Sequence, residues 1–144
     1  MDTTTLEELL KKDGKLVYKT RGVSMLPMLR QNRDLVVIEV PSGRLKQDDV
    51  ALYRRGKDYV LHRVLEVKDG YYHIRGDNTY SVEHVPDTAV IGVLTAFVRD
   101  GKKILVTDRK YQMYVRVWRH TYGLRVFYLR CRRFGSRVKH KLLG

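Results

Sequence analysis

Three short segments of this 144-residue chain carry side chains that would cooperate in acyl transfer. The stretch GVSMLP places the hydroxyl of Ser24 between a flexible glycine and a rigid proline. The stretch LHRV places His62 inside an apolar strand pattern, and GDN places Asp77 after a strand. A nucleophilic serine needs a base within reach, and that base needs a partner that fixes its tautomer. Together the three segments predict a catalytic triad of Ser24, His62 and Asp77.

The predicted roles follow from the chemistry of each side chain. The Ser24 hydroxyl would attack a carbonyl carbon, and His62 would take its proton, because an imidazole titrates near neutral pH. Asp77 would accept the second N–H of His62 and stabilise the imidazolium. Each segment alone also fits a structural interpretation, which stays open here. Ser24 would cap an ordinary loop, His62 would be a buried structural residue, and GDN would be a common turn.

The elements that must position these residues are mainly β-strands. A Thr before an acidic first turn, with Gly14 after a basic last turn, predicts a helix over residues 5–12. Asp69-Gly70 and Asp100-Gly101 are typical of tight hairpins, and residues 55–58 form a third predicted turn. No long helix separates the strands, which argues against a parallel α/β fold. Seven strands are predicted, over residues 16–20, 34–40, 50–54, 59–67, 71–75, 90–99 and 102–107.

Charge divides the chain at Asp108. The formal net charge is +13, yet residues 1–108 hold 18 basic and 16 acidic residues, whereas residues 109–144 hold 11 basic residues and no acid. We therefore divide the chain into a β domain over residues 1–108 and a basic, aromatic-rich extension over residues 109–144. Apolar residues recur near the helical period from Tyr111 to Leu129, which predicts a helix within residues 109–134.

The order of these segments resembles the superfamily of signal peptidases and LexA-type self-cleaving repressors. GVSMLP is similar to the nucleophile box, whose core here is Ser24, Met25 and Pro27, and residues 34–38 and 49–53 resemble the two strands that follow it. His62 and the GDN stretch resemble the endoplasmic-reticulum and archaeal signal peptidases, which use Ser and His rather than Ser and Lys. The resemblance spans residues 19–98. It implies a β-ribbon peptidase fold and a serine endopeptidase activity on a protein or leader peptide. We predict no cofactor, and the remaining histidines have no acid or cysteine at metal-ligand spacing, which argues against a metal site.

Three departures from this pattern bear on the substrate more than on the chemistry. Signal peptidases carry an N-terminal membrane anchor, and the residues before Ser24 include no apolar stretch of that kind. Many also place a serine two residues before the nucleophile, where this chain has Gly22, so the oxyanion would bind to backbone N–H groups, chiefly that of Ser24. The second acid that follows GDN in the endoplasmic-reticulum type has only Glu83 as a rough counterpart.

Three interpretations of residues 109–144 remain open. The aromatic residues Trp118, Tyr122, Phe127 and Phe134 would enter a membrane interface while arginines meet anionic head groups, which we favour over nucleic-acid binding. Alternatively, part of the segment packs on the β domain. A single cysteine, Cys131, and the absence of a secretory signal pattern predict a cytoplasmic protein, peripheral on the inner face of the membrane in the first interpretation. The rival to the peptidase is a non-catalytic regulatory or binding module of the same fold, whose basic tail engages membrane or nucleic acid.

Overall fold

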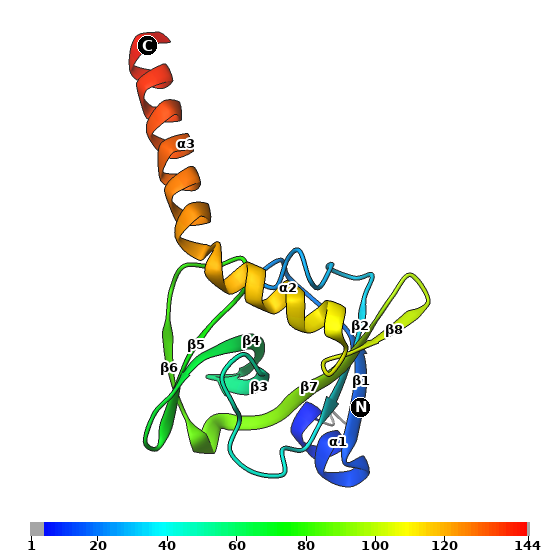
Figure 1. Cartoon of the computed structure of the whole chain (residues 1–144). Helices are drawn as coiled ribbons and strands as arrows, with labels where there is room; N and C mark the ends of the chain where they lie inside the picture. The colour runs from blue at the N-terminus through cyan, green and yellow to red at the C-terminus, as the bar shows by residue number, and fades with distance from the viewer. Residues whose placement is uncertain (1–4, 144) are drawn as a thin grey trace.

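Among the described residues an antiparallel sheet of eight strands is the largest structural element, so the prediction of a mainly β fold is confirmed. Figure 1 shows the computed structural model, which describes residues 5–143 and their side chains as far as Gly135. Seven strands follow one another in the order β1-β2-β7-β3-β4-β5-β6, and β8 pairs with β7. The strands are β1 (Lys15–Lys19), β2 (Leu35–Glu39), β3 (Val50–Arg55), β4 (Asp58–Val67), β5 (Tyr71–Arg75), β6 (Glu83–Pro86), β7 (Val90–Arg99) and β8 (Lys102–Leu105).

The N-terminal helix forms for the reasons that its sequence suggested. Helix α1 (Leu6–Asp13) begins after Thr5, whose side chain accepts from the Glu8 N–H while the Glu8 carboxylate accepts from the Thr5 N–H. This capping box satisfies two N–H groups that the helix itself leaves free. Gly14 ends the helix with a φ of 70°, a left-handed conformation that glycine adopts without a steric penalty. Leu10 then points from α1 into the core.

The strand missing from our prediction is β6. Its four residues, Glu83 to Pro86, show no apolar alternation, and a proline inside a run of residues normally argues against a strand. Here Pro86 is the last residue of the strand at the end of the sheet order, opposite Tyr71, so it removes no hydrogen bond from the sheet interior. A short 3-10 helix, η1 (Asp87–Ala89), then leads into β7.

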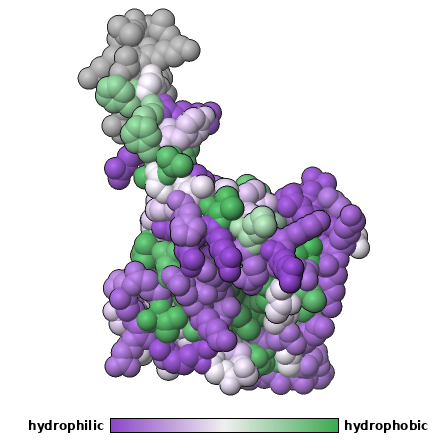
Figure 2. Space-filling view, in the orientation of Figure 1, coloured by the Kyte–Doolittle hydropathy of each residue, from purple (hydrophilic) through white to green (hydrophobic). Residues whose placement is uncertain are grey.

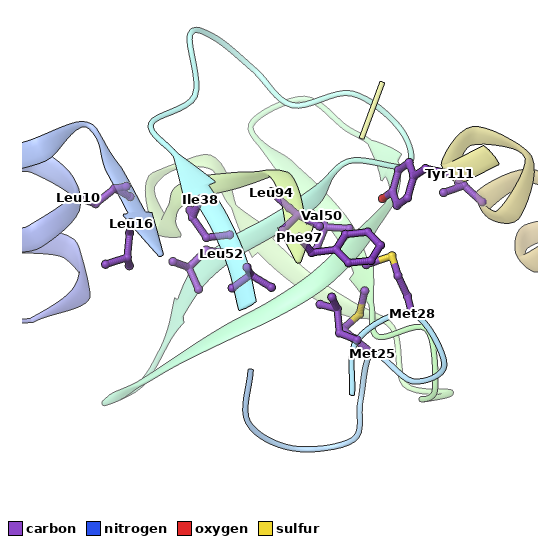
Figure 3. Packing of buried hydrophobic residues seen from close by; sticks show 13 residues of the cluster. Leu10, Leu16, Met25, Met28, Ile38, Val50, Leu52, Leu94, Phe97 and Tyr111 are labelled. Carbon is purple, nitrogen blue, oxygen red and sulfur yellow. The ribbon is translucent and has the colours of Figure 1, made fainter. Parts of the chain in front are cut away.

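The main hydrophobic core joins the sheet to elements from both ends of the chain. Figure 3 shows Leu10 and Leu16 at one end of this core and Met25, Met28, Phe97 and Tyr111 at the other. Met25 and Met28 come from the segment that carries Ser24, so burial of these thioethers fixes that segment against the sheet. A second hydrophobic cluster is formed by side chains of β3 to β6 together with Leu45. Its members are Leu45, Ala51, Tyr53, Val64, Tyr72, Ile74 and Val85.

The basic extension forms two helices rather than one. Helix α2 (Arg109–His120) and helix α3 (Tyr122–Leu143) meet at Thr121, and α3 continues beyond residue 134, where we expected the helix to end. Tyr111 and Val115 of α2 belong to the main core, so this core crosses the division that we placed after Asp108. Helix α3 instead extends away from the sheet (Figure 1). No helix among the described residues is long and apolar enough to cross a membrane.

Candidate active site

Polar contacts close the base of the loop that carries Ser24. This loop runs from Thr20 to Asp34, and the Thr20 N–H donates to the Asp34 carbonyl at 3.2 Å. The carboxylate of Asp34 is fully buried and accepts from the backbone N–H of Arg30 at 2.8 Å and from its guanidinium at 2.9 Å. A buried carboxylate with several donors holds its neighbours firmly, because leaving any donor unpaired would be costly. These contacts therefore fix the two ends of the loop that carries the nucleophile.

The GDN segment after β5 fastens the loop at its tip. The Asn78 N–H donates to the Ser24 carbonyl at 2.7 Å, and the Asn78 side chain donates to the Val23 carbonyl at 3.1 Å. The N–H of Asp77 contacts the sulfur of Met25 at 3.4 Å. The structure thus brings together residues 22–27 and 76–78, which are far apart in the sequence. The nucleophile loop is held between the sheet and this segment.

Gly76 packs against both the backbone of Ser24 and the ring of His62. A methyl group placed on its Cα would lie 2.7 Å from the Ser24 carbonyl oxygen and 3.0 Å from Nε2 of His62. Both contacts are closer than side chains normally make, so a side chain at this position would force the Ser24 loop or His62 to move, although the backbone φ of Gly76 is not in the left-handed region. Among the described residues no hydrogen bond joins the Ser24 hydroxyl to His62, and such catalytic contacts often tighten only with substrate bound.

The opposite nitrogen of His62 belongs to a short polar chain. Nδ1 lies 3.2 Å from the hydroxyl of Tyr53, and that hydroxyl donates to the Glu83 carboxylate at 3.0 Å. A phenol has a single proton, so a hydroxyl that donates to Glu83 must accept from the Nδ1–H of His62. Nε2 then carries no proton and faces the Ser24 loop. This is the tautomer that a general base for Ser24 requires.

Burial and charge set the protonation of this chain. Burial lowers the pKa of His62 below its ordinary value, the negative charge of Glu83 partly opposes the shift, and the positive charge of Arg55 reinforces it. The imidazole is therefore neutral, and able to accept a proton, at neutral pH. Burial, together with the charge of Glu83, raises the pKa of Tyr53, which keeps its phenol protonated and able to donate.

Asp77 does not orient His62, so this part of the predicted triad is wrong. Its two oxygens accept from Nε and Nη2 of Arg63 at 2.7 and 2.8 Å, and both side chains are buried. Neighbouring residues of a strand point to opposite faces of the sheet, and the Asp77 carboxylate lies on the face of Arg63 rather than that of His62. The charge of Asp77 reaches His62 only as a minor influence that raises its pKa.

Helix α2 completes the surroundings of Asp77. The hydroxyl of Tyr114 donates to its carboxylate at 3.2 Å, and the indole N–H of Trp118 donates to its backbone carbonyl at 2.9 Å. Nη1 of Arg63 contacts the Tyr111 hydroxyl at 3.2 Å, and Nη2 contacts the sulfur of Met28 at 3.3 Å. Arg63 and Asp77 thereby link α2 to the nucleophile loop.

Two adjoining cavities meet at Ser24. One, of about 710 Å³, is bordered by the end of β1 and by the tip of the β3–β4 hairpin, with Tyr18, Lys19 and Tyr59 in its wall. The other, of about 400 Å³, contains His62 and Glu83. Gly22 lines the larger cavity with a φ of 78°, and among the described residues the Ser24 N–H has no hydrogen-bond acceptor. Met25 is buried beneath the loop, and Pro27 lines a separate apolar cavity beside α2.

Tyr53 was not predicted from the sequence. Glu83 was recognised only as a rough counterpart of the second acid in the endoplasmic-reticulum type of signal peptidase. The hairpin register could have revealed Tyr53, because His62 pairs with Ala51 and Val60 pairs with Tyr53. Residues 53 and 62 are therefore diagonal neighbours on one face. Glu83 lies on β6, the strand that we did not predict. Within the described residues no cluster of three or more histidine, cysteine or acidic side chains could hold a metal ion.

Comparison with known proteins adds no assignment. No model of a protein family matches the sequence, and no curated protein matches it. Conclusions about function therefore depend on the geometry of this site.

Proposed function

We propose that this protein is a serine peptidase of the signal-peptidase type, with Ser24 as nucleophile and His62 as general base. The observation that carries the proposal is the arrangement of the two nitrogens of His62. Nδ1 is occupied by the Tyr53 hydroxyl, whereas Nε2 faces the Ser24 loop across Gly76. Glu83, acting through Tyr53, takes the orienting role that we had expected of Asp77. Asp77 positions the loop instead.

The reaction would proceed in two acyl-transfer steps. The Ser24 oxygen attacks the peptide carbonyl as Nε2 of His62 takes its proton, and the Ser24 N–H binds the oxygen that becomes negative. The C–N bond then breaks as His62 gives the proton to the leaving amine, and an ester to Ser24 remains. Water attacks this ester with His62 again as base, which releases the carboxylate product and restores the hydroxyl. Glu83 favours the positively charged His62 that both steps form.

The larger cavity suits an extended peptide. Among the described residues β1 pairs with β2 alone and is the first strand in the sheet order, so its other edge offers backbone groups that no described strand pairs. An extended peptide can add to such an edge as a further strand, and its backbone hydrogen bonds give affinity largely independent of sequence. The cavity at the end of this strand leads to Ser24, so a bound peptide would pass its scissile bond over the nucleophile. This favours limited cleavage of an unfolded segment.

The test is cleavage of a complex peptide mixture by the full chain. Purified protein is incubated with peptides from a digested proteome, and new termini are counted by mass spectrometry. We expect wild type to create new termini with a shared sequence pattern, and Ser24→Ala and His62→Ala each to abolish them. Ser81→Ala is the matched control, because Ser81 also lines the His62 cavity yet has no role in the mechanism.

Two results would overturn the proposal. One is cleavage by a folded Ser24→Ala protein at the wild-type rate. The other is a folded wild type that creates no new termini, which would favour a non-catalytic binding module. Circular dichroism of every variant establishes that the β fold is retained.

A further inference from the structure

The outer part of helix α3 exposes large apolar side chains along one face. Leu124, Phe127, Tyr128 and Phe134 are each 63 to 69% exposed. They follow the helical spacing i, i+3, i+4 and i+10, so they form one stripe, with the exposed Cys131 within it. Figure 2 shows hydrophobic residues gathered on the arm that projects from a mostly hydrophilic body. A stripe of this size in water is unfavourable unless it has an occupant.

The first part of the extension is already occupied, which corrects our expectation for two aromatic residues. The Trp118 indole donates to Asp77, and the Arg125 guanidinium lies 3.5 Å from its ring centroid. The Arg75 guanidinium covers Tyr122 at 3.4 Å. Trp118 and Tyr122 therefore belong to the body of the protein. The exposed apolar residues of α3, from Leu124 onward, are left to bind something else.

The charges around the stripe are all of one sign. Arg130 and Arg132 are exposed on either side of it, and the sequence from Arg109 onward contains no acidic residue. A second copy of this helix would bring arginines against arginines with no acid to pair them. Nucleic acid would neutralise the arginines but leave the phenylalanines in water. An anionic lipid surface satisfies both, because head groups meet the arginines while the apolar stripe enters the interface.

We propose that the α3 stripe, Leu124, Phe127, Tyr128 and Phe134, binds the surface of an anionic membrane, with the helix axis in the plane of the interface. Helix α2 and the sheet remain outside the lipid. Tyr114 of α2 hydrogen-bonds to Asp77, which in turn pairs with Arg63. Because these contacts join α2 to the sheet, binding of α3 would hold the Ser24 cleft at a fixed position relative to the membrane surface. The proposal does not depend on the chemistry of Ser24. It narrows the membrane-binding region from the whole basic extension to one face of α3.

Flotation with lipid vesicles tests the proposal on the full chain. Vesicles of phosphatidylcholine alone are compared with vesicles that contain about one third phosphatidylglycerol. We expect flotation only with the anionic vesicles, and its loss as salt is raised. Phe127→Ser with Phe134→Ser should weaken binding about 10-fold or more, because two large apolar side chains no longer enter the interface. Met113→Ser with Val117→Ser is the matched control, since these residues of α2 are similarly exposed.

Charge is tested separately. Arg130→Gln and Arg132→Gln together should weaken binding about 30-fold, at about fivefold for each arginine lost near the surface. The control changes three exposed lysines of the sheet domain, Lys46, Lys102 and Lys103, to Gln and should leave binding nearly unchanged. The single tryptophan gives a third readout. Trp118 should not be quenched by brominated lipid, whereas a Phe127→Trp, Trp118→Phe protein should be.

Several outcomes would overturn the proposal. These are equal flotation with neutral and anionic vesicles, equal loss of binding in the α2 control, and salt-sensitive binding of an oligonucleotide with no flotation. Self-association that the Phe127→Ser, Phe134→Ser variant abolishes, again with no flotation, would assign the stripe to a second copy of the chain.

Discussion

Asp77 and Glu83 are close in sequence and contact neighbouring parts of the site, but their surroundings differ. The Asp77 side chain is 3% exposed and pairs with the equally buried Arg63. The Glu83 side chain is 26% exposed and divides its oxygens between the Tyr53 hydroxyl and the surface residue Arg55. A buried charge that loses its partner is very unfavourable, whereas a partly solvated one is tolerated. The first acid therefore maintains the structure, and the second adjusts the chemistry of His62.

The largest expected effect is a loss of stability in Asp77→Asn. This change leaves the Arg63 guanidinium buried without a counter-charge and weakens the contact with Tyr114. We expect the free energy of unfolding to fall by about 3–5 kcal/mol. Urea titration followed by circular dichroism measures it. Glu83→Gln is the matched acid-to-amide control and should change stability by no more than about 1 kcal/mol. Equal losses in the two variants would remove the distinction between these acids.

The next effect concerns Gly76, which packs against both the Ser24 backbone carbonyl and the His62 ring. Gly76→Ala would place a methyl 2.7 Å from a backbone carbonyl, which cannot rotate away, and 3.0 Å from Nε2 of His62. The loop must move, and a displacement of this kind typically costs about 100-fold in rate. Peptide cleavage measures the loss. Gly43→Ala is the control, because nothing lies near its added methyl and its φ is not positive. A fully active Gly76→Ala protein would show that the approach of Ser24 and His62 is unimportant.

A smaller effect is expected when the polar chain behind His62 is broken. Tyr53→Phe leaves the Nδ1–H without its acceptor, and Glu83→Gln removes the charge at the end of the chain. Each should lower kcat about 10- to 100-fold with little change in KM, because the interaction strengthens only when His62 becomes charged. The double variant should be little slower than either single one. Additive losses would show that the two residues act separately.

Local signals in the sequence predicted most of the fold but only part of the site. The α1 caps and the hairpin turns involve residues a few positions apart, so their physics is visible in the chain. Strand β6 has no such signal, and its pairing depends on β5. The partner of Asp77 was hidden for a similar reason. His62 and Arg63 are adjacent on β4 and place a basic side chain on each face of the sheet. The path of residues 76–78 decides which of the two side chains Asp77 contacts.

The smallest effect is a pair of opposite shifts in the pH dependence of cleavage. The pKa of His62 lies below its ordinary value of 6.5, so activity should fall on acidification only below that pH, as the base becomes protonated. Glu83 raises this pKa by its charge, and Arg55 lowers it. Glu83→Gln should therefore move the acidic limb of kcat/KM to lower pH, and Arg55→Gln should move it to higher pH. Each shift should be about one pH unit or less.

The opposite signs make this experiment informative, because Glu83 and Arg55 form one ion pair at 2.6 Å. If the pair only held β3 against β6, removing either partner would have the same effect and leave the limb in place. Arg44→Gln, which breaks another exposed pair with Asp87, should not move the limb at all. The pH dependence of the free energy of unfolding is an independent check that the pKa of His62 is lowered in the folded protein. The unfolded chain binds a proton at His62 more readily than the folded one, so stability should decrease as the pH falls below 6.5. A thermal melting series across that range should show this decrease reduced in a His62→Gln protein.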